Sequence, residues 1–146
     1  MNKFMNSLSF PDVNVWLALI LDHHVHRTAA LQWWNRPDTG QVGLLRLTQI
    51  SVLRLLTTAA AMDSKPLTLS EAWQTYDRLY EDDRVALFPE PTGLERDFRR
   101  LSSAKTASPK VWADAYLVAF ASCHQGQLVT FDRALENRGA DCLVLR

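Results

Sequence analysis

Three aspartates occupy positions from which their carboxylates could bind a metal ion. Asp12 follows the short run SLSF, Asp132 directly follows LVTF, and Asp114 interrupts the apolar segment VWADAYLVAFAS. Burying an unpaired carboxylate is costly, and carboxylates that converge repel one another unless a cation neutralises them. Oxygen ligands without histidine or cysteine favour Mg²⁺, or Mn²⁺ in its place, over zinc. The three residues together predict a site for a hard divalent cation.

Each aspartate also has a structural interpretation when it is considered alone. Asp12 or Asn14 could cap a helix that begins near Val15, and Asp132 could cap a short turn in RALEN. Asp114 could belong to a buried ion pair. These alternatives stay open for the single residues, whereas the joint pattern favours the metal site.

Short runs rich in β-forming residues alternate with longer segments of helical spacing. The strand candidates are 7–10, 42–45, 85–88, 128–131 and 142–145, and the helix candidates are 14–20, 27–36, 48–61, 69–81, 93–103 and 109–124. This alternation predicts an α/β fold with a mainly parallel sheet, and we expect residues 1–146 to form a single domain. If the first and fourth strands are neighbours, Asp12 and Asp132 emerge at the same carboxyl edge, where such sheets bind ligands.

The segment around Asp114 predicts a helix with a defined start. Ser108 is a suitable N-cap, and Pro109 suits the first helical position, where no amide hydrogen bond is needed. The helix body is almost wholly apolar, which predicts that it is buried on all sides. Asp114 lies six residues past Ser108, beyond the reach of a cap and of most of the helix-dipole effect. A structural reason for this carboxylate is therefore hard to find.

The composition indicates a folded protein without a membrane segment. Of its 146 residues, 47% are hydrophobic, and they occur in short periodic runs instead of one stretch of about 18 apolar residues. The N-terminus lacks the pattern of a signal peptide, so we expect a cytoplasmic protein. Cys123 and Cys142 form no CxxC pair and lie near no histidine at zinc-ligand spacing, so we expect two free, buried thiols.

Charge is distributed unevenly along the chain. The formal net charge is zero, which argues against nucleic-acid binding by bulk electrostatics alone. Residues 63–97 contain nine acidic and four basic side chains, a net charge of −5, so the remainder carries +5. The densest group of basic residues consists of Arg99, Arg100, Lys105 and Lys110. No acidic residue lies between Arg99 and Lys110.

Five segments, in this order and over nearly the whole chain, carry a resemblance to a known family. They are PDVNVWLAL with Asp12 and Asn14, DHHVHRTAALQWW, LTQISVLRLLT, VWADAYLVAFA with Asp114, and LVTFDRAL with Asp132. In these segments the chain resembles the PIN-domain ribonucleases, and in particular the VapC toxins of bacterial toxin–antitoxin pairs. The resemblance implies a three-layer PIN-like fold whose sheet of about five strands is flanked by helices. It also implies Mg²⁺-dependent endoribonuclease activity on RNA, a VapB-like antitoxin partner, and a homodimer or a toxin–antitoxin hetero-oligomer.

One position departs from the pattern of the family it resembles. The family usually has a glutamate near the start of its third helix, where this chain has Gln49. An amide oxygen can coordinate a metal or position a water but brings no negative charge, which weakens the case for a second tightly bound metal. We hypothesise that Asp12 and Asp114 bind one Mg²⁺, while Asp132 and Gln49 orient the attacking water or a second transient metal.

The basic residues just before the Asp114 helix are candidate contacts for the RNA backbone. Phosphate contacts supply affinity that does not depend on sequence, which suits Arg99, Arg100, Lys105 and Lys110. A solvated basic face is the alternative for this group. The motif that contains Asp12 adds Asn14 as a further candidate substrate contact.

Two clusters of ring side chains admit more than one interpretation. His23, His24 and His26 point in different directions at a helix entry, so a substrate contact or a surface position is favoured over zinc. Trp33 and Trp34 are adjacent and cannot both face the core of one helix. The one that is partly exposed is a candidate contact for the antitoxin or for a second subunit.

Two other classes of protein compete with the nuclease. A PIN-like module weakened at Gln49 could bind RNA or a protein without cutting. A phosphatase or phosphoacceptor domain is disfavoured, because a phosphoaspartate hydrolase would need a second aspartate where DVNVW has Asn14.

Overall fold

A parallel sheet forms the centre of the protein in the computed structural model, which describes residues 7–146. The five strands found in this part are β1 (Leu8–Pro11), β2 (Gln41–Leu44), β3 (Val85–Leu87), β4 (Gln127–Thr130) and β5 (Asp141–Val144). They lie in the order β3-β2-β1-β4-β5, and every pairing is parallel. All five predicted strands are thereby confirmed, each with bounds within one residue of those expected.

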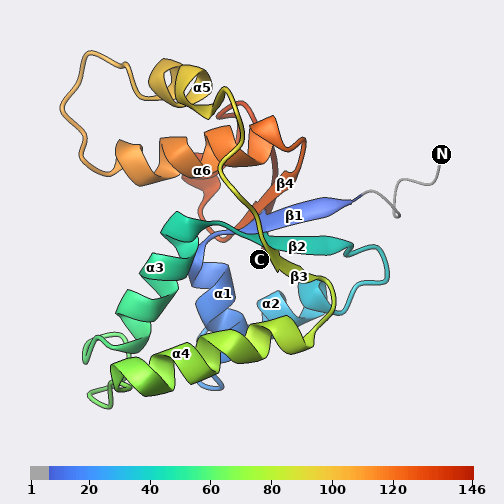
Figure 1. The fold of residues 1–146 in the computed structure, drawn as a ribbon, viewed down its shortest axis with the longest axis vertical. Coiled ribbons are helices and arrows are strands. Elements are labelled where there is room, and N and C mark those ends of the chain that lie inside the picture. The colour runs from blue at the N-terminus through green and yellow to red at the C-terminus, as the bar shows by residue number, and fades with distance from the viewer. Residues whose placement is uncertain (1–6) are drawn as a thin grey trace.

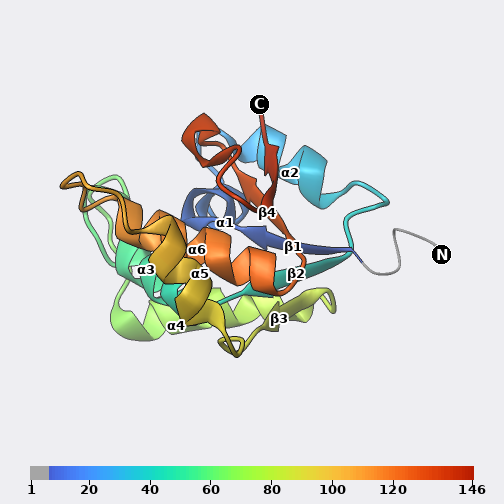
Figure 2. The ribbon, with the colours of Figure 1, turned by 90° about the horizontal axis from the view of Figure 1, so that it is seen from above.

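Helices cover both faces of the sheet (Figure 1). They are α1 (Val13–Ile20), α2 (Arg27–Trp34), α3 (Arg46–Leu56), α4 (Leu69–Asp77), α5 (Leu94–Leu101) and α6 (Val111–Cys123), with short 3₁₀ helices η2 (Arg78–Glu81) and η3 (Arg133–Leu135). Helices α5 and α6 lie on one face and α1 to α4 on the other, as the view turned by 90° also shows (Figure 2). The three-layer α/β fold class is confirmed.

The core consists of two apolar clusters, one on each face of the sheet. The cluster under α1 to α4 centres on Trp16, which is fully buried, with side chains from β2, β3 and β4. The cluster under α5 and α6 centres on Phe10 and Phe120, whose rings meet edge to face at a centroid distance of 5.5 Å. Because both faces of the strands are covered, their apolar runs are continuous instead of alternating.

Helix α6 begins later than the sequence predicted, which changes the surroundings of Asp114. Its N-cap is Lys110, and no side chain caps it, so the expected start at Ser108 and Pro109 is wrong. The chain first makes a turn, in which the Val111 amide donates to the Ser108 carbonyl at 3.1 Å. Asp114 therefore lies in the first helical turn, where the positive end of the helix dipole favours a carboxylate.

The start of α6 is also more exposed than its apolar sequence predicted. Trp112 retains 59% of its accessible surface, and the first buried residue of the helix is Ala115. Helix α3 likewise ends before the predicted limit, at Leu56, because the Thr57 and Thr58 hydroxyls donate to the Arg54 carbonyl and compete with helical hydrogen bonds. Cys123 and Cys142 are free, as expected, but only half-buried.

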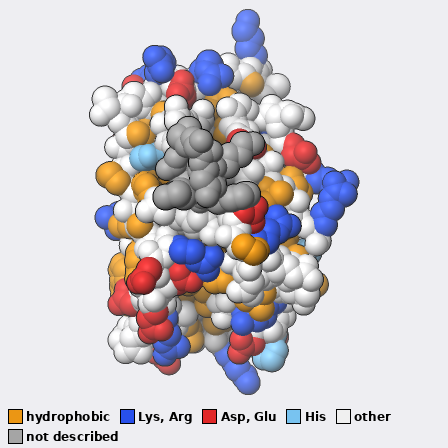
Figure 3. All heavy atoms as spheres, turned by 90° about the vertical axis from the view of Figure 1, so that its right-hand side faces the viewer, with side chains coloured by type: hydrophobic (Ala, Val, Ile, Leu, Met, Phe, Trp, Pro, Cys, Tyr) orange, Lys and Arg blue, Asp and Glu red, His pale blue; other side chains and the backbone are white. Residues whose placement is uncertain are grey.

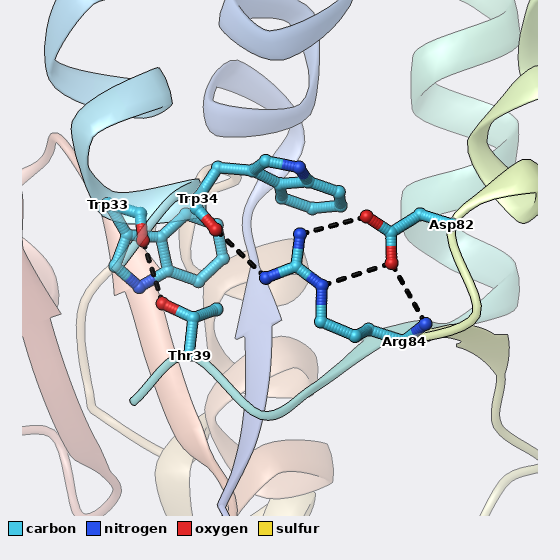
Figure 4. Close-up of polar contacts among 5 residues, drawn as sticks. All are labelled: Trp33, Trp34, Thr39, Asp82 and Arg84. Carbon is cyan, nitrogen blue, oxygen red and sulfur yellow. Dashed lines mark hydrogen bonds and ion pairs between the residues drawn. The ribbon is translucent and has the colours of Figure 1, made fainter. Parts of the chain in front are cut away.

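The two adjacent tryptophans have different partners: the Trp33 carbonyl accepts from the Thr39 hydroxyl, and Trp34 contacts Arg84, the residue before β3 (Figure 4). Trp33 is buried, whereas the half-buried Trp34 ring lies under the Arg84 guanidinium at 4.4 Å from ring centroid to Cζ. Arg84 also donates to the Trp34 carbonyl at 2.9 Å and forms a forked ion pair with Asp82. The prediction that only one of the two indoles faces the core is confirmed.

No described helix is both long and apolar enough to span a membrane. On the side of the molecule near the N-terminus, the described residues mix basic, acidic and apolar side chains (Figure 3).

Candidate metal and nuclease site

The site lies where the strand order of the sheet reverses. Strands β1 and β4 pair in parallel, with Pro11 opposite Val129, and the Asp12 amide continues the pairing by donating to the Val129 carbonyl at 2.9 Å. Asp12 and Asp132 therefore leave their strands at the same carboxyl edge, as the sequence predicted. Open α/β sheets bind their ligands at such reversal points.

Asp12 is fixed by hydrogen bonds to both of its carboxylate oxygens. It is the N-cap of α1, with Oδ1 accepting from the Val15 amide at 3.2 Å, and Oδ2 accepts from the Thr130 hydroxyl. Burial raises the pKa of the Asp12 carboxyl above its usual 3.8, the hydrogen bonds from Thr130 and Val15 oppose this rise, and the charge of Asp132 adds to it. Asp12 can therefore cap α1 and belong to the acidic site at the same time.

Asp132 is the exposed member of the site. It caps η3, since its Oδ1 accepts from the Ala134 amide at 2.9 Å, as its single-residue interpretation predicted. Its own amide donates to the Thr130 hydroxyl oxygen at 2.9 Å. Thr130 thus joins Asp12 to Asp132, a role that the sequence interpretation missed although this threonine is fully buried at the end of β4.

Asp114 approaches the same place from α6. Burial raises the pKa of its carboxyl, the negative charge of Asp132 raises it further, and the positive charge of Arg138 lowers it. The charge of Asp132 thus raises the pKa of both other aspartates. No hydrogen bond or ion pair engages the Asp114 carboxylate within the described part of the chain, so it is available to a ligand.

The three carboxylates meet the chemical requirements of a hard cation without forming a compact cluster. Among residues 7–146, no three His, Cys, Asp or Glu side chains lie close enough together to hold a metal ion as they stand. The donors at this edge are all carboxylate oxygens. Burial and the charge of Asp132 raise the pKa of Asp12 and Asp114, and a divalent cation would relieve this repulsion. The residues therefore fit Mg²⁺ or Mn²⁺ by chemistry and charge.

Gln49 is held by two protein partners in the first part of α3. It is buried, its Oε1 accepts from Arg46 Nη1 at 2.6 Å, and its Nε2 donates to the Tyr76 hydroxyl at 3.2 Å. Tyr76 in turn shares a short hydrogen bond with Tyr80. The water-orienting role of Gln49 stays a prediction, since these contacts show only that its amide fixes the Arg46 side chain.

The basic residues near α6 divide into paired and unpaired side chains. Arg99 forms an ion pair with Glu95 at 3.0 Å, and Arg100 lies 3.8 Å from Asp97. Lys105 and Lys110 are exposed and form no ion pair with any described residue. The exposed loop 102–110 therefore carries the available positive charge, next to the start of the helix that bears Asp114.

The remaining predicted contacts lie at the surface near the same edge. Asn14 is exposed in the first turn of α1. The His26 ring stacks on Phe131, the residue before Asp132, at a centroid distance of 4.4 Å, while His24 accepts from the His26 amide at 3.0 Å. A substrate contact by either histidine stays a prediction.

Comparison with known proteins agrees with this arrangement. The sequence matches the PIN domain family over residues 9–140. It is 44% identical to Ribonuclease VapC41 of Mycobacterium tuberculosis over 133 residues, which cover 88% of this chain and 91% of the relative. It is 30% identical to Ribonuclease VapC29 of the same organism, with 92% of each chain covered.

Two solved structures share the fold of this chain. One chain of VapBC2 from Rickettsia felis, bound to a DNA fragment from its promoter, superposes with a TM-score of 0.64 at 10% identity and covers 95% of this chain and 99% of its own. A chain of FitAcB from Neisseria gonorrhoeae gives a TM-score of 0.59 at 17% identity, with 92% and 96% covered. At these identities the likeness shows the fold alone.

A parallel sheet with acidic side chains at its reversal point defines a PIN domain, and the chain belongs to this family. Within it, the chain belongs to the VapC ribonucleases, as its identity to VapC41 over most of both sequences shows.

Proposed function

We propose that the protein is a Mg²⁺-dependent endoribonuclease and the toxin of a VapBC-type toxin–antitoxin pair. The observation that carries the proposal is that Thr130 joins Asp12 to Asp132 at the reversal point of a PIN sheet, since its hydroxyl donates to the Asp12 carboxylate and accepts from the Asp132 amide. Mn²⁺ is expected to substitute for Mg²⁺, because it prefers the same oxygen ligands.

The residues of the chain have separate parts in the proposed hydrolysis. Asp12 and Asp114 would hold the ion, and Thr130 keeps the Asp12 carboxylate in place. When bound, Mg²⁺ would stabilise the charge that develops on the scissile phosphate and make a nearby water more acidic. Asp132, the most exposed of the three, would orient that water together with Gln49 and would accept its proton. Lys105 and Lys110 would draw the RNA backbone toward the site.

A VapB-like antitoxin is the proposed protein partner. A chain of VapBC2 from Rickettsia felis, a structure named for VapB and VapC together, shares the fold. A groove between α1, α2 and η2 offers such a partner both apolar and charged side chains. Its lining consists of Leu19, Leu31, Trp34 and Leu79 together with Arg78, Glu81 and Asp82. Exposed apolar side chains on α3 and α4, among them Ile50 and Trp73, support self-association, as a homodimer or within a toxin–antitoxin hetero-oligomer.

The competing proposal is a PIN-like module that binds RNA or a protein without cutting. The amide of Gln49, engaged by Arg46 and Tyr76 where a charged ligand would be expected, favours this alternative.

Replacing Asp114 by Asn separates the two proposals. The nuclease proposal predicts that Asp114→Asn abolishes Mg²⁺-dependent cleavage of structured RNA, because the amide brings no negative charge to the metal. Cleavage is followed by gel electrophoresis with purified protein, and thermal unfolding should remain cooperative. Asp141→Asn is the control, since this exposed carboxylate lies at the start of β5, at the opposite edge of the sheet. Full activity of Asp114→Asn would refute the assignment, and an inactive wild-type protein that still binds RNA would support the alternative.

A further inference from the structure

A groove of about 530 Å³ lies at the carboxyl ends of β2 and β3. The residues that form it include Arg46, Leu87, Phe88, Pro89, Glu90 and Tyr116. Tyr116 follows Asp114 by two residues on α6, so the groove and the acidic site share a helix. Sites for small organic ligands usually enclose about 300 to 1,000 Å³, so a nucleotide has room here.

One end of the groove carries a positive charge that is held in position. Arg46 is exposed as the first residue of α3, and its guanidinium donates to Gln49 at 2.6 Å. No carboxylate lies within ion-pair distance of it among residues 7–146. A guanidinium that is fixed by a neutral amide and keeps its charge uncompensated suits a phosphate group.

The groove also carries the carboxylate of Glu90, one oxygen of which is free to accept a hydrogen bond. Glu90 Oε1 accepts from the Tyr116 hydroxyl at 2.7 Å, while its second oxygen has no hydrogen-bond partner in the described structure. Burial, followed by the hydrogen bond and the charge of Glu90, raises the pKa of Tyr116 to about 12, so the phenol stays protonated. A carboxylate oxygen accepts hydrogen bonds from the exocyclic amino groups of bases.

The wall between the two charged ends is apolar and aromatic. Leu87 is 37% exposed, and the half-buried rings of Phe88 and Tyr116 line the same groove. Unpaired RNA bases bind proteins chiefly by stacking on such side chains and by hydrogen bonds from their edges.

We propose that this groove binds one nucleotide of the RNA strand, with its phosphate on Arg46 and an amino-bearing base (adenine, cytosine or guanine) against Tyr116 and Glu90. Uracil presents a carbonyl oxygen where cytosine has its amino group, so Glu90 would repel it. The inference depends on the proposed function for RNA as the ligand and adds a base preference to it.

Binding to homopolymers tests the role of Glu90. Fluorescent oligo(A), oligo(C) and oligo(U) are titrated with the whole protein in EDTA, and anisotropy gives each Kd. We expect oligo(U) to bind about tenfold more weakly than oligo(C), and Glu90→Gln to remove most of this difference. Glu81→Gln, an exposed carboxylate on η2, should keep it. Equal affinities of the wild-type protein for the three oligonucleotides would overturn the inference.

The salt dependence of the same Kd tests Arg46. Losing one phosphate contact to a single strand should reduce the slope of log Kd against log salt by about 0.7 in Arg46→Ala. Arg46→Lys should keep the slope, because the charge remains, and so should Arg54→Ala, an exposed arginine on the same helix. Thermal unfolding checks that each variant is folded. An unchanged slope in folded Arg46→Ala would place the strand elsewhere and overturn the inference.

These measurements do not require cleavage, so the two proposals can fail separately. If the protein shows the base preference and Arg46→Ala reduces the salt slope of log Kd, but the protein never cuts RNA, the nuclease proposal is refuted and the proposed nucleotide-binding groove is supported. A protein that cuts RNA with Mg²⁺ but shows neither property would refute the groove and leave the nuclease proposal standing.

Discussion

At the scale of single residues, burial and the charge of Asp132 together set the pKa values of the other two aspartates. Asp12 and Asp114 are the more buried carboxylates, and burial is the main reason that their pKa values are raised. The exposed Asp132 raises both further, because like charges disfavour ionisation of their neighbours. Ionisation of one carboxyl group therefore affects the others, and a bound cation would favour the ionised form of each.

Replacing Asp132 by Asn should lower the pKa of both Asp12 and Asp114. Carboxyl carbon NMR of the metal-free protein, followed as pH is varied, measures both shifts. A carboxyl whose pKa is higher in the folded protein binds protons more tightly there, so the free energy of unfolding falls as pH rises from 3.8 through the raised pKa. This loss should be smaller in Asp132→Asn. Unchanged titration of both aspartates would show that Asp132 does not act on them.

At the scale of elements, the start of α6 brings two functions together. The turn before Val111 places Asp114 in the first helical turn, and loop 102–110 ends at the same point. Arg99 and Arg100 are neutralised within α5 by Glu95 and Asp97, so the loop lysines remain the unpaired cations. We therefore expect the RNA backbone to contact the lysines of this loop close to the carboxylates of the site.

Charge reversal in the loop should weaken RNA binding without affecting the fold. We expect the double variant Lys105→Glu and Lys110→Glu to raise the RNA Kd and to flatten its salt slope, because phosphate contacts release counterions. Filter binding over a series of salt concentrations measures both. Lys65→Glu is the control, an exposed lysine in the segment between α3 and α4. A slope equal to that of the wild-type protein would count against the loop as an RNA contact.

At the scale of the whole molecule, the parallel sheet makes the site possible. The chain returns from β3 across the sheet to add β4 on the other side of β1, and this crossover includes α5 and α6. The carboxylates come from the end of β1, from α6 and from the end of β4, so they meet only when the sheet is assembled. A ligand shared by the three segments should therefore stabilise the entire fold.

Mg²⁺ should raise the thermal unfolding temperature as its concentration increases. A ligand that binds only the folded state stabilises it by about 2.7 kcal/mol at a hundredfold excess over its Kd. Differential scanning fluorimetry at constant ionic strength measures the shift, with NaCl as the salt control. Asp114→Asn should lose most of the Mg²⁺ effect. The same shift in wild type and variant would indicate that the ion binds elsewhere.

The sequence by itself determined the strands and the acidic residues of this protein. The runs SLSF and LVTF predicted β1 and β4, and their aspartates predicted one shared edge, because parallel strands end on the same side of a sheet. Only the tertiary structure placed the start of α6 at Val111 and joined Asp12 to Asp132 through Thr130. The reason is that strand patterns are local, whereas a hydrogen bond between Asp12 and Thr130, or a groove between Arg46 and Glu90, depends on how distant segments pack.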